Sequence, residues 1–174
     1  MLPAQLKWPG LTDGNTLIIS VDKQDFGITA EALRYDGRIF LPKQETHITV
    51  FGSELGSRLL QKFMQHPALE QKVHEAFEST DWSYRPTPEL HHLARNKTIP
   101  GKDSSTEETI VMLIEMEGMT IFYSKLRKLG LIGKDHPVPP PHVTLYTRNI
   151  DQGIGIDSEK ELAELSRGRV DLDL

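Results

Sequence analysis

Apolar and β-branched residues gather in short runs that turn residues separate, a pattern typical of buried β-strands. The clearest run, residues 16–21, lies between Gly14-Asn15 and Asp22. Residues 108–116 form a second run, and residues 142–147 form a third that follows a proline-rich approach. The pattern predicts strands at residues 16–21, 38–41, 45–51, 82–85, 90–95, 108–116 and 142–147.

Elsewhere apolar residues repeat every three or four positions, which predicts helices. In residues 120–129 this spacing places Ile121, Leu126 and Leu129 toward the core, and Gly130 follows as a stop. Ser158 and Glu161 form a capping-box pattern at the start of the last helix. The predicted helices cover residues 29–35, 53 to the break at His66-Pro67, 67–77, 120–129 and 158–166. Residues 86–106, rich in polar and turn residues, are expected to form a long surface loop around the strand at 90–95.

The two halves of the chain repeat one order of elements: a buried strand, a helix, and a strand that opens with His-x-Thr. This order predicts an α+β fold built from diverged copies. The length of 174 residues fits a single domain over residues 1–174, with approximate halves 15–79 and 107–166.

Composition narrows the chemistry that the chain can perform. It contains no cysteine, which excludes disulfides, thiol catalysis and cysteine-ligated metals. Acidic residues outnumber Lys and Arg by 25 to 20, so broad binding to duplex DNA is not expected. The longest apolar run, residues 110–114, is far too short to span a membrane, and residues 1–10 lack a signal-peptide pattern. We therefore expect a cytoplasmic protein without a membrane anchor.

The two His-x-Thr motifs are the strongest functional signal in the sequence. His47-Ile48-Thr49 and His142-Val143-Thr144 stand 95 residues apart, each in a predicted strand. Alternation along a strand puts the histidine and threonine on one face and the apolar residue on the other. If the halves pack about an approximate two-fold axis, both polar faces meet in one groove. Two imidazoles can then serve as acid and base at a phosphodiester, while the hydroxyls bind its oxygens, without a metal ion.

Extended by one residue, the motifs read His47-Ile48-Thr49-Val50 and His142-Val143-Thr144-Leu145, with Pro42 to Glu45 before the first and Pro140-Pro141 before the second. In these residues the chain resembles the 2H phosphoesterase superfamily, which includes RNA 2′,3′-cyclic phosphodiesterases and 2′–5′ RNA ligase-like proteins. The resemblance spans roughly residues 17–146. It implies a bilobal α+β fold with pseudo-two-fold symmetry around a central cleft.

The resemblance also implies an activity: metal-independent hydrolysis of a 2′,3′-cyclic phosphate at an RNA end, or of a small cyclic or 2′–5′-linked nucleotide. His47 and His142 would be the acid/base pair, and Thr49 and Thr144 would bind the phosphate. We expect no cofactor, a small cyclic nucleotide or short RNA terminus as partner, and a monomer. The alternative is a module that binds a nucleotide or RNA end in the same cleft without catalysis.

Further residues near the motifs leave alternatives open. Tyr146 and Arg148 continue the second motif strand on the face of His142 and Thr144, and could contact phosphate or base, or form an exposed strand end. His91 and His92 could border the groove or, with His136, bind a metal in a metallohydrolase of another kind. Adjacent residues of a strand point to opposite faces, which argues against the metal site. Phe51, Trp82, Tyr84 and Tyr123 could stack on a base, but burial in the core is favoured.

Overall fold

The computed structural model describes residues 5–172, over which the protein has four α-helices and one eight-stranded antiparallel sheet. The strands are β1 (Leu17–Val21), β2 (Leu33–Tyr35), β3 (Arg38–Pro42), β4 (Thr46–Phe51), β5 (Arg85–Lys97), β6 (Ser105–Glu115), β7 (His142–Arg148) and β8 (Ser166–Arg169). The helices are α1 (Ser53–Gln65), α2 (Pro67–Glu78), α3 (Glu117–Lys128) and α4 (Glu159–Leu165), with a 3-10 turn, η1, at Lys23–Phe26. The predicted α+β class is confirmed.

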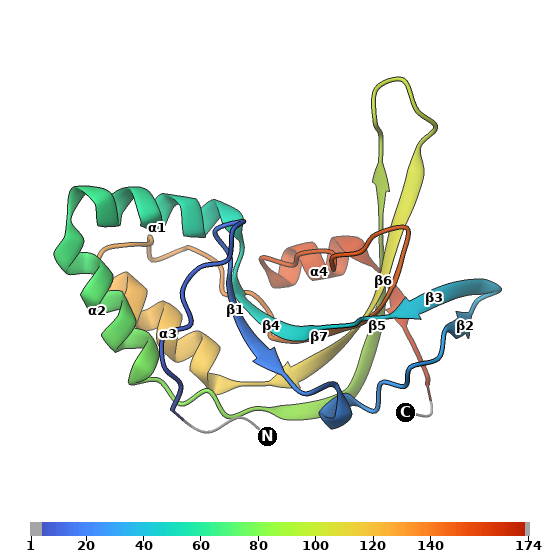
Figure 1. Ribbon diagram of the computed structural model, residues 1–174, viewed down its shortest axis with the longest axis horizontal. Coiled ribbons are helices and arrows are strands. Elements are labelled where there is room, and N and C mark those ends of the chain that lie inside the picture. The colour runs from blue at the N-terminus through green and yellow to red at the C-terminus, as the bar shows by residue number, and fades with distance from the viewer. Residues whose placement is uncertain (1–4, 173–174) are drawn as a thin grey trace.

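The two strands with His-x-Thr motifs lie next to each other in the sheet. The strand order is β1-β4-β7-β6-β5-β8; in addition, β3 pairs with the end of β7, and β2 pairs with β3 (Figure 1). Strands from both expected halves therefore belong to one continuous sheet. Around the β4–β7 contact, β1 and β6 occupy equivalent outer places.

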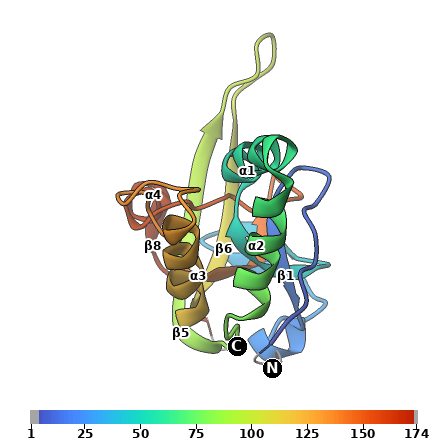
Figure 2. The ribbon, with the colours of Figure 1, turned by 90° about the vertical axis from the view of Figure 1, so that its left-hand side faces the viewer.

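Each face of the sheet has its own apolar core. The larger core takes the inward faces of α1, α2 and α3, which gather on one side of the molecule (Figure 2). The smaller core lies under α4 and includes Leu93, Val111, Ile154, Ile156 and Leu162. The four candidate aromatic residues, Phe51, Trp82, Tyr84 and Tyr123, are all buried in the larger core, as favoured from the sequence.

Helix ends follow the predicted signals closely. The chain breaks between α1 and α2 at His66, because Pro67 fits the first turn of a new helix. Ser158 caps α4 by accepting a hydrogen bond from the Glu161 N–H. Ile121 is the exception: α3 begins at Glu117, and its buried face is formed by Met119, Phe122, Tyr123 and Leu126. Ile121 is therefore 43% exposed instead of inward.

The predicted helix over residues 29–35 is wrong. Residues 33–35 form β2 and turn back into β3 through Asp36 and Gly37, which both have positive φ angles of 48° and 73°. Cross-strand pairing, from Leu33 opposite Phe40 to Tyr35 opposite Arg38, overrides the weak helical pattern. The first half consequently has η1, and no α-helix, between its buried strand and its motif strand.

The loop predicted over residues 86–106 is also wrong, although the strand predicted within it at 90–95 is confirmed as part of β5. Strands β5 and β6 pair along almost their whole length, down to Lys97 opposite Ser105, and form a hairpin that projects far from the body (Figure 1). A register shift between Pro86 and Leu90 accommodates the two prolines of β5. Residues 82–84, predicted as a strand, precede β5.

Among the described residues, no helix combines the length and apolarity needed to cross a membrane. The first four residues of the segment judged to lack a signal-peptide pattern lie outside the described residues.

Candidate active site

Strands β4 and β7 bring the two motifs together at the centre of the sheet. Ile48 is opposite Val143 in an antiparallel pair, and both side chains are fully buried in the larger core. Because side chains alternate between the faces of a strand, the histidine and threonine that flank each of these residues point to the opposite face. The motifs are 95 residues apart in the chain and meet on this face. The resulting HxT cluster consists of His47, Thr49, His142 and Thr144.

The register gives the HxT cluster a local two-fold arrangement. Continuing the antiparallel pairing by one residue on each side places His47 beside Thr144 and Thr49 beside His142. Side chains directly opposite in such a pair have Cβ atoms roughly 5 Å apart, and diagonal neighbours roughly 7–8 Å apart. The two imidazoles therefore lie on one diagonal and the two hydroxyls on the other. A tetrahedral phosphate centred among them would meet an imidazole on each of two sides.

The ring of His142 is held in a defined state. Its Nδ1 lies 2.8 Å from the carbonyl oxygen of Pro140, so Nδ1 carries the proton and donates it there. This leaves Nε2 as the unprotonated nitrogen of the neutral ring. Burial lowers the pKa of His142, although the Pro140 carbonyl acts in the opposite direction, and the nearby His47 lowers it further. The fixed tautomer and the lowered pKa, which keeps the ring neutral, suit a proton acceptor.

His47 is more accessible than His142 and has a different environment. Partial burial lowers its pKa, the positive charge of Lys43 adds to this effect, and Glu45 opposes it. The amino group of Lys43 is held by the segment after β7, because its Nζ donates to the Asp151 carbonyl oxygen at 2.9 Å. Because a positive charge on His47 lowers the pKa of His142, protonation of one imidazole disfavours protonation of the other. The pair would therefore hold one added proton more readily than two.

The two hydroxyls of the HxT cluster take no part in the hydrogen bonds of the described fold. Thr49 and Thr144 are half-buried, and neither hydroxyl has a hydrogen-bond partner within residues 5–172. Gly153 packs against Thr144: a Cβ atom at position 153 would lie 2.5 Å from Thr144 Oγ1. The segment after β7 therefore reaches the site only because residue 153 lacks a side chain.

Tyr146 and Arg148 do not share the face of the HxT cluster. The pairing of β6 with β7 shifts register so that Ile110 is opposite Tyr146 and Val111 is opposite Thr144. One extra residue of β7 is accommodated there, which reverses the alternation beyond it. Tyr146 is consequently 2% exposed and packed in the larger core. The expectation of one common face is wrong, because simple alternation does not include the bulge.

Arg148 belongs to a buried charge cluster beside the site. Its NH1 donates to the carboxylate of Glu108, which also contacts the guanidinium of Arg38 and, at 2.9 Å, Nε2 of His92. Burial would raise the pKa of Glu108, but Arg148, His92 and Arg38 more than offset it and hold the pKa below its ordinary value. Arg148 remains one-third exposed, and its contact with substrate stays a prediction.

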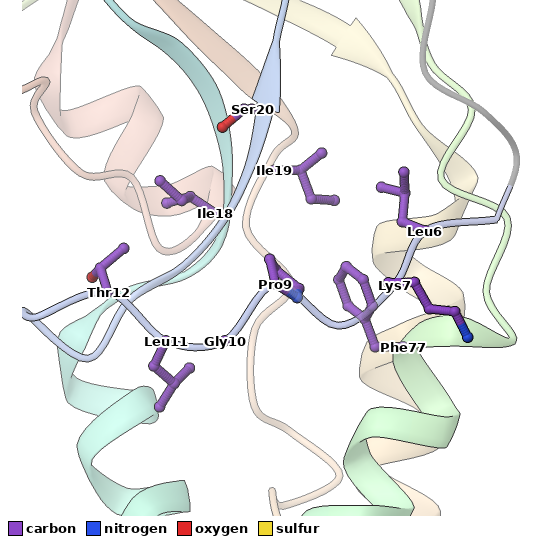
Figure 3. Close-up of a pocket in the computed structure, with 10 residues that line it drawn as sticks. All are labelled: Leu6, Lys7, Pro9, Gly10, Leu11, Thr12, Ile18, Ile19, Ser20 and Phe77. Atoms are coloured by element: carbon purple, nitrogen blue, oxygen red, sulfur yellow. The ribbon is translucent and has the colours of Figure 1, made fainter.

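Two cavities flank the HxT cluster on the sheet. One, of about 450 Å³, lies between residues 6–12 and β1 and includes Ile18 and Ser20, the residues opposite Thr49 and His47 (Figure 3). The other, of about 410 Å³, lies at the far end of β7, between β3 and residues 149–151.

No group of three or more residues within 5–172 has an arrangement suited to a metal ion. His91 and His92 point to opposite faces, as expected for strand neighbours, and each binds a carboxylate: His91 Nε2 lies 2.9 Å from Glu89 and His92 Nε2 lies 2.9 Å from Glu108. His136 stacks on Tyr123 instead, with ring centroids 6.1 Å apart.

Three features of the site were missed from the sequence: Lys43 beside His47, Gly153 against Thr144, and the exposed β3 residues near the end of β7. Only Gly153 carried a usable signal, because residues 153–156 alternate glycine with isoleucine in the manner of an extended segment with one buried face.

Comparisons with protein-family models, curated proteins and solved structures found no match to this chain.

Proposed function

We propose that the protein is a phosphodiesterase of the 2H type that hydrolyses a 2′,3′-cyclic phosphate at an RNA end, or a small cyclic or 2′–5′-linked nucleotide. The observation that carries the proposal is the pairing of β4 with β7, which unites the two His-x-Thr motifs on one face of the sheet. A structural role for these polar residues would not require both pairs to meet around a common centre.

The same pairing supports the bilobal duplication as part of the proposal. In the order β1-β4-β7-β6, each motif strand has its own antiparallel partner on the outer side. The β4–β7 contact would then be the junction of two related halves, with the pseudo-two-fold axis normal to the sheet. The absence of an α-helix between β1 and β4 would be a divergence of the first half.

In the proposed reaction His142 begins as the base. Its Nε2 accepts a proton from a water molecule, whose oxygen forms a bond to phosphorus. The bond from phosphorus to one ribose oxygen breaks, and protonated His47 donates a proton to that oxygen, giving a nucleoside monophosphate. The negative charge of the bound phosphate raises the pKa of His47 and favours its charged form. Thr49 and Thr144 donate hydrogen bonds to the non-bridging oxygens, where charge develops.

A direct test is hydrolysis of 2′,3′-cyclic nucleotides and of 2′–5′-linked dinucleotides in the presence of EDTA. We expect wild-type activity to survive the chelator and the variants His47→Ala and His142→Ala each to lose on the order of 10²–10⁴-fold in kcat, the range for a general acid or base. His66→Ala, at an exposed histidine between α1 and α2, is the matched control and should retain activity.

Three results would contradict the proposal. Activity abolished by EDTA would indicate metal chemistry, and activity that survives both substitutions would remove the histidines from the mechanism. Binding of a nucleotide without any product would favour the alternative of a non-catalytic nucleotide- or RNA-end-binding module.

A further inference from the structure

The cavity at the far end of β7 has two unusual walls. Ile39 and Leu41 of β3 are 53% and 61% exposed, while Phe40 between them is fully buried. Ile39 and Leu41 are therefore aliphatic strand residues that the rest of the described fold leaves largely uncovered. Both line the 410 Å³ cavity together with Ile150, while its other lining residues are polar or charged. This size, and the presence of aliphatic side chains beside a few polar groups, are typical of small-molecule subsites.

The bulge in β7 connects this cavity to the HxT cluster. Without it, Thr147 would point away from the face of Thr144, because the two residues are three positions apart. With the extra residue between them, Thr147 turns to the same face and lines the cavity, opposite Leu41. Bulges commonly re-aim side chains next to functional sites. Thr144 and Thr147 are roughly 10 Å apart along the strand, so a ligand bound by the first can extend to the second.

The polar groups of the cavity suit a heteroaromatic ring with hydrogen-bonding edges. The Thr147 hydroxyl has no partner within the described residues, and the exposed side chain of Asp151 makes no ion pair there. Asp151 is held in place through its backbone carbonyl, which accepts from Lys43 Nζ. The positive charge of Lys43 also lowers the pKa of His47, so one side chain binds the cavity wall and acts electrostatically on the HxT cluster.

Resting on the proposed function, we infer that this cavity is the subsite for the nucleobase of the nucleotide whose phosphate binds the HxT cluster. Ile39 and Leu41 pack on the plane of the base, and Thr147 and Asp151 face its polar edge. The other flanking cavity, at β1, lacks this combination of exposed aliphatic side chains and unpaired polar groups.

The test compares two substrates, a nucleoside 2′,3′-cyclic phosphate and the 2′,3′-cyclic phosphate of 1-O-methylribose, which has no base. Leu41→Ser and Ile39→Ser change exposed residues and should fold normally. We expect each to reduce the preference for the nucleotide, measured as the ratio of kcat/KM values, about tenfold, the order expected for losing the burial of one aliphatic side chain. The loss should appear in KM, since base binding is shared by ground state and transition state.

Met64→Ser is the matched control, because Met64 of α1 is 78% exposed and lines neither flanking cavity. A preference that is unchanged in the two β3 variants, or equally reduced in the control, overturns the inference while the proposed function stands. If wild type hydrolyses neither substrate, the proposed function fails. In that case calorimetry with a nucleoside 2′-monophosphate and with 1-O-methylribose 2-phosphate tests the subsite: weaker nucleotide binding in Leu41→Ser supports it, and equal binding refutes it.

Discussion

The contact between Gly153 and Thr144 gives the sharpest test of the site. A Cβ atom at position 153 would lie 2.5 Å from Thr144 Oγ1, whereas ordinary contact begins at 3.4 Å. In Gly153→Ala these two atoms must therefore move about 0.9 Å further apart. Rotating the threonine would relieve this approach only by moving the hydroxyl away from its place in the HxT cluster, and Thr144 Cβ would still lie 3.3 Å from the new atom. Either the hydroxyl or the segment after β7 must move.

This displacement should affect activity more than stability. A misplacement of about 1 Å can cost on the order of 10²-fold in rate, so we expect kcat for a 2′,3′-cyclic nucleotide to fall by that order. Overpacking costs about 1–3 kcal/mol; we expect about 1 kcal/mol here, because the segment is half-buried, which corresponds to a Tm lower by about 2–4 °C. The two measurements are steady-state hydrolysis and thermal unfolding.

Gly155→Ala is the matched control within the same segment. A Cβ atom there meets nothing within 4 Å, and its φ angle is not positive, so activity and Tm should be retained. In a Thr144→Ala background Gly153→Ala should cause little further loss, since both substitutions act on one hydroxyl. Two results would refute the reasoning. One is an equal loss of activity in Gly153→Ala and Gly155→Ala; the other is a loss of activity from Gly153→Ala that is as large in the Thr144→Ala background as in wild type.

Two further predictions concern stability. Burial lowers the pKa of both His47 and His142 in the folded state, so protonation of either ring favours unfolding. The stability that depends on neutral rings should be at its full value above about pH 6.5, the ordinary pKa of histidine. It should decrease as the pH falls through the folded-state pKa values. Urea unfolding at pH 7.5 and 5.5 should show a smaller drop in His142→Gln than in wild type; identical drops would contradict this. Glu108→Gln should cost roughly 3 kcal/mol, the lower end for breaking a buried ion pair, because both arginines remain about one-third exposed. Glu115→Gln, in an exposed pair with Arg85, should cost less than about 1 kcal/mol. Similar losses in Glu108→Gln and Glu115→Gln would show that the buried Glu108 cluster stabilises the fold no more than an exposed ion pair does.

The sequence was most informative where local chemistry decides the structure. The motif strands, the break at Pro67 and the Ser158 cap each depend on a few neighbouring residues, and all were predicted within a few positions. The uneven spacing of polar and apolar residues in β5 and the short β2 strand were misjudged, because cross-strand pairing overrides the local pattern: β5 pairs with β6 and β8, and β2 pairs with the adjacent β3.

For the site, alternation along each strand was sufficient to place the histidine and threonine of each motif together, but it could not reveal the register that joins β4 to β7. The same rule failed at Tyr146, because the bulge depends on how β6 pairs with β7. The contact of Gly153 with Thr144 involves a connecting segment whose alternation of glycine and isoleucine indicates one buried face but does not show which strand it packs against.

The local two-fold arrangement of the HxT cluster has a consequence for directionality. A symmetric set of four groups binds a phosphate equally well in two orientations, so by itself it cannot distinguish the attacking oxygen from the departing one. In the proposed reaction the polarity of the substrate would come from features that lack a symmetric counterpart. These are the Pro140 carbonyl, which fixes the tautomer of His142, and the β2–β3 hairpin beside β7. Exchanging this hairpin, with the central residues unchanged, would be a route to reversing which ribose oxygen retains the phosphate.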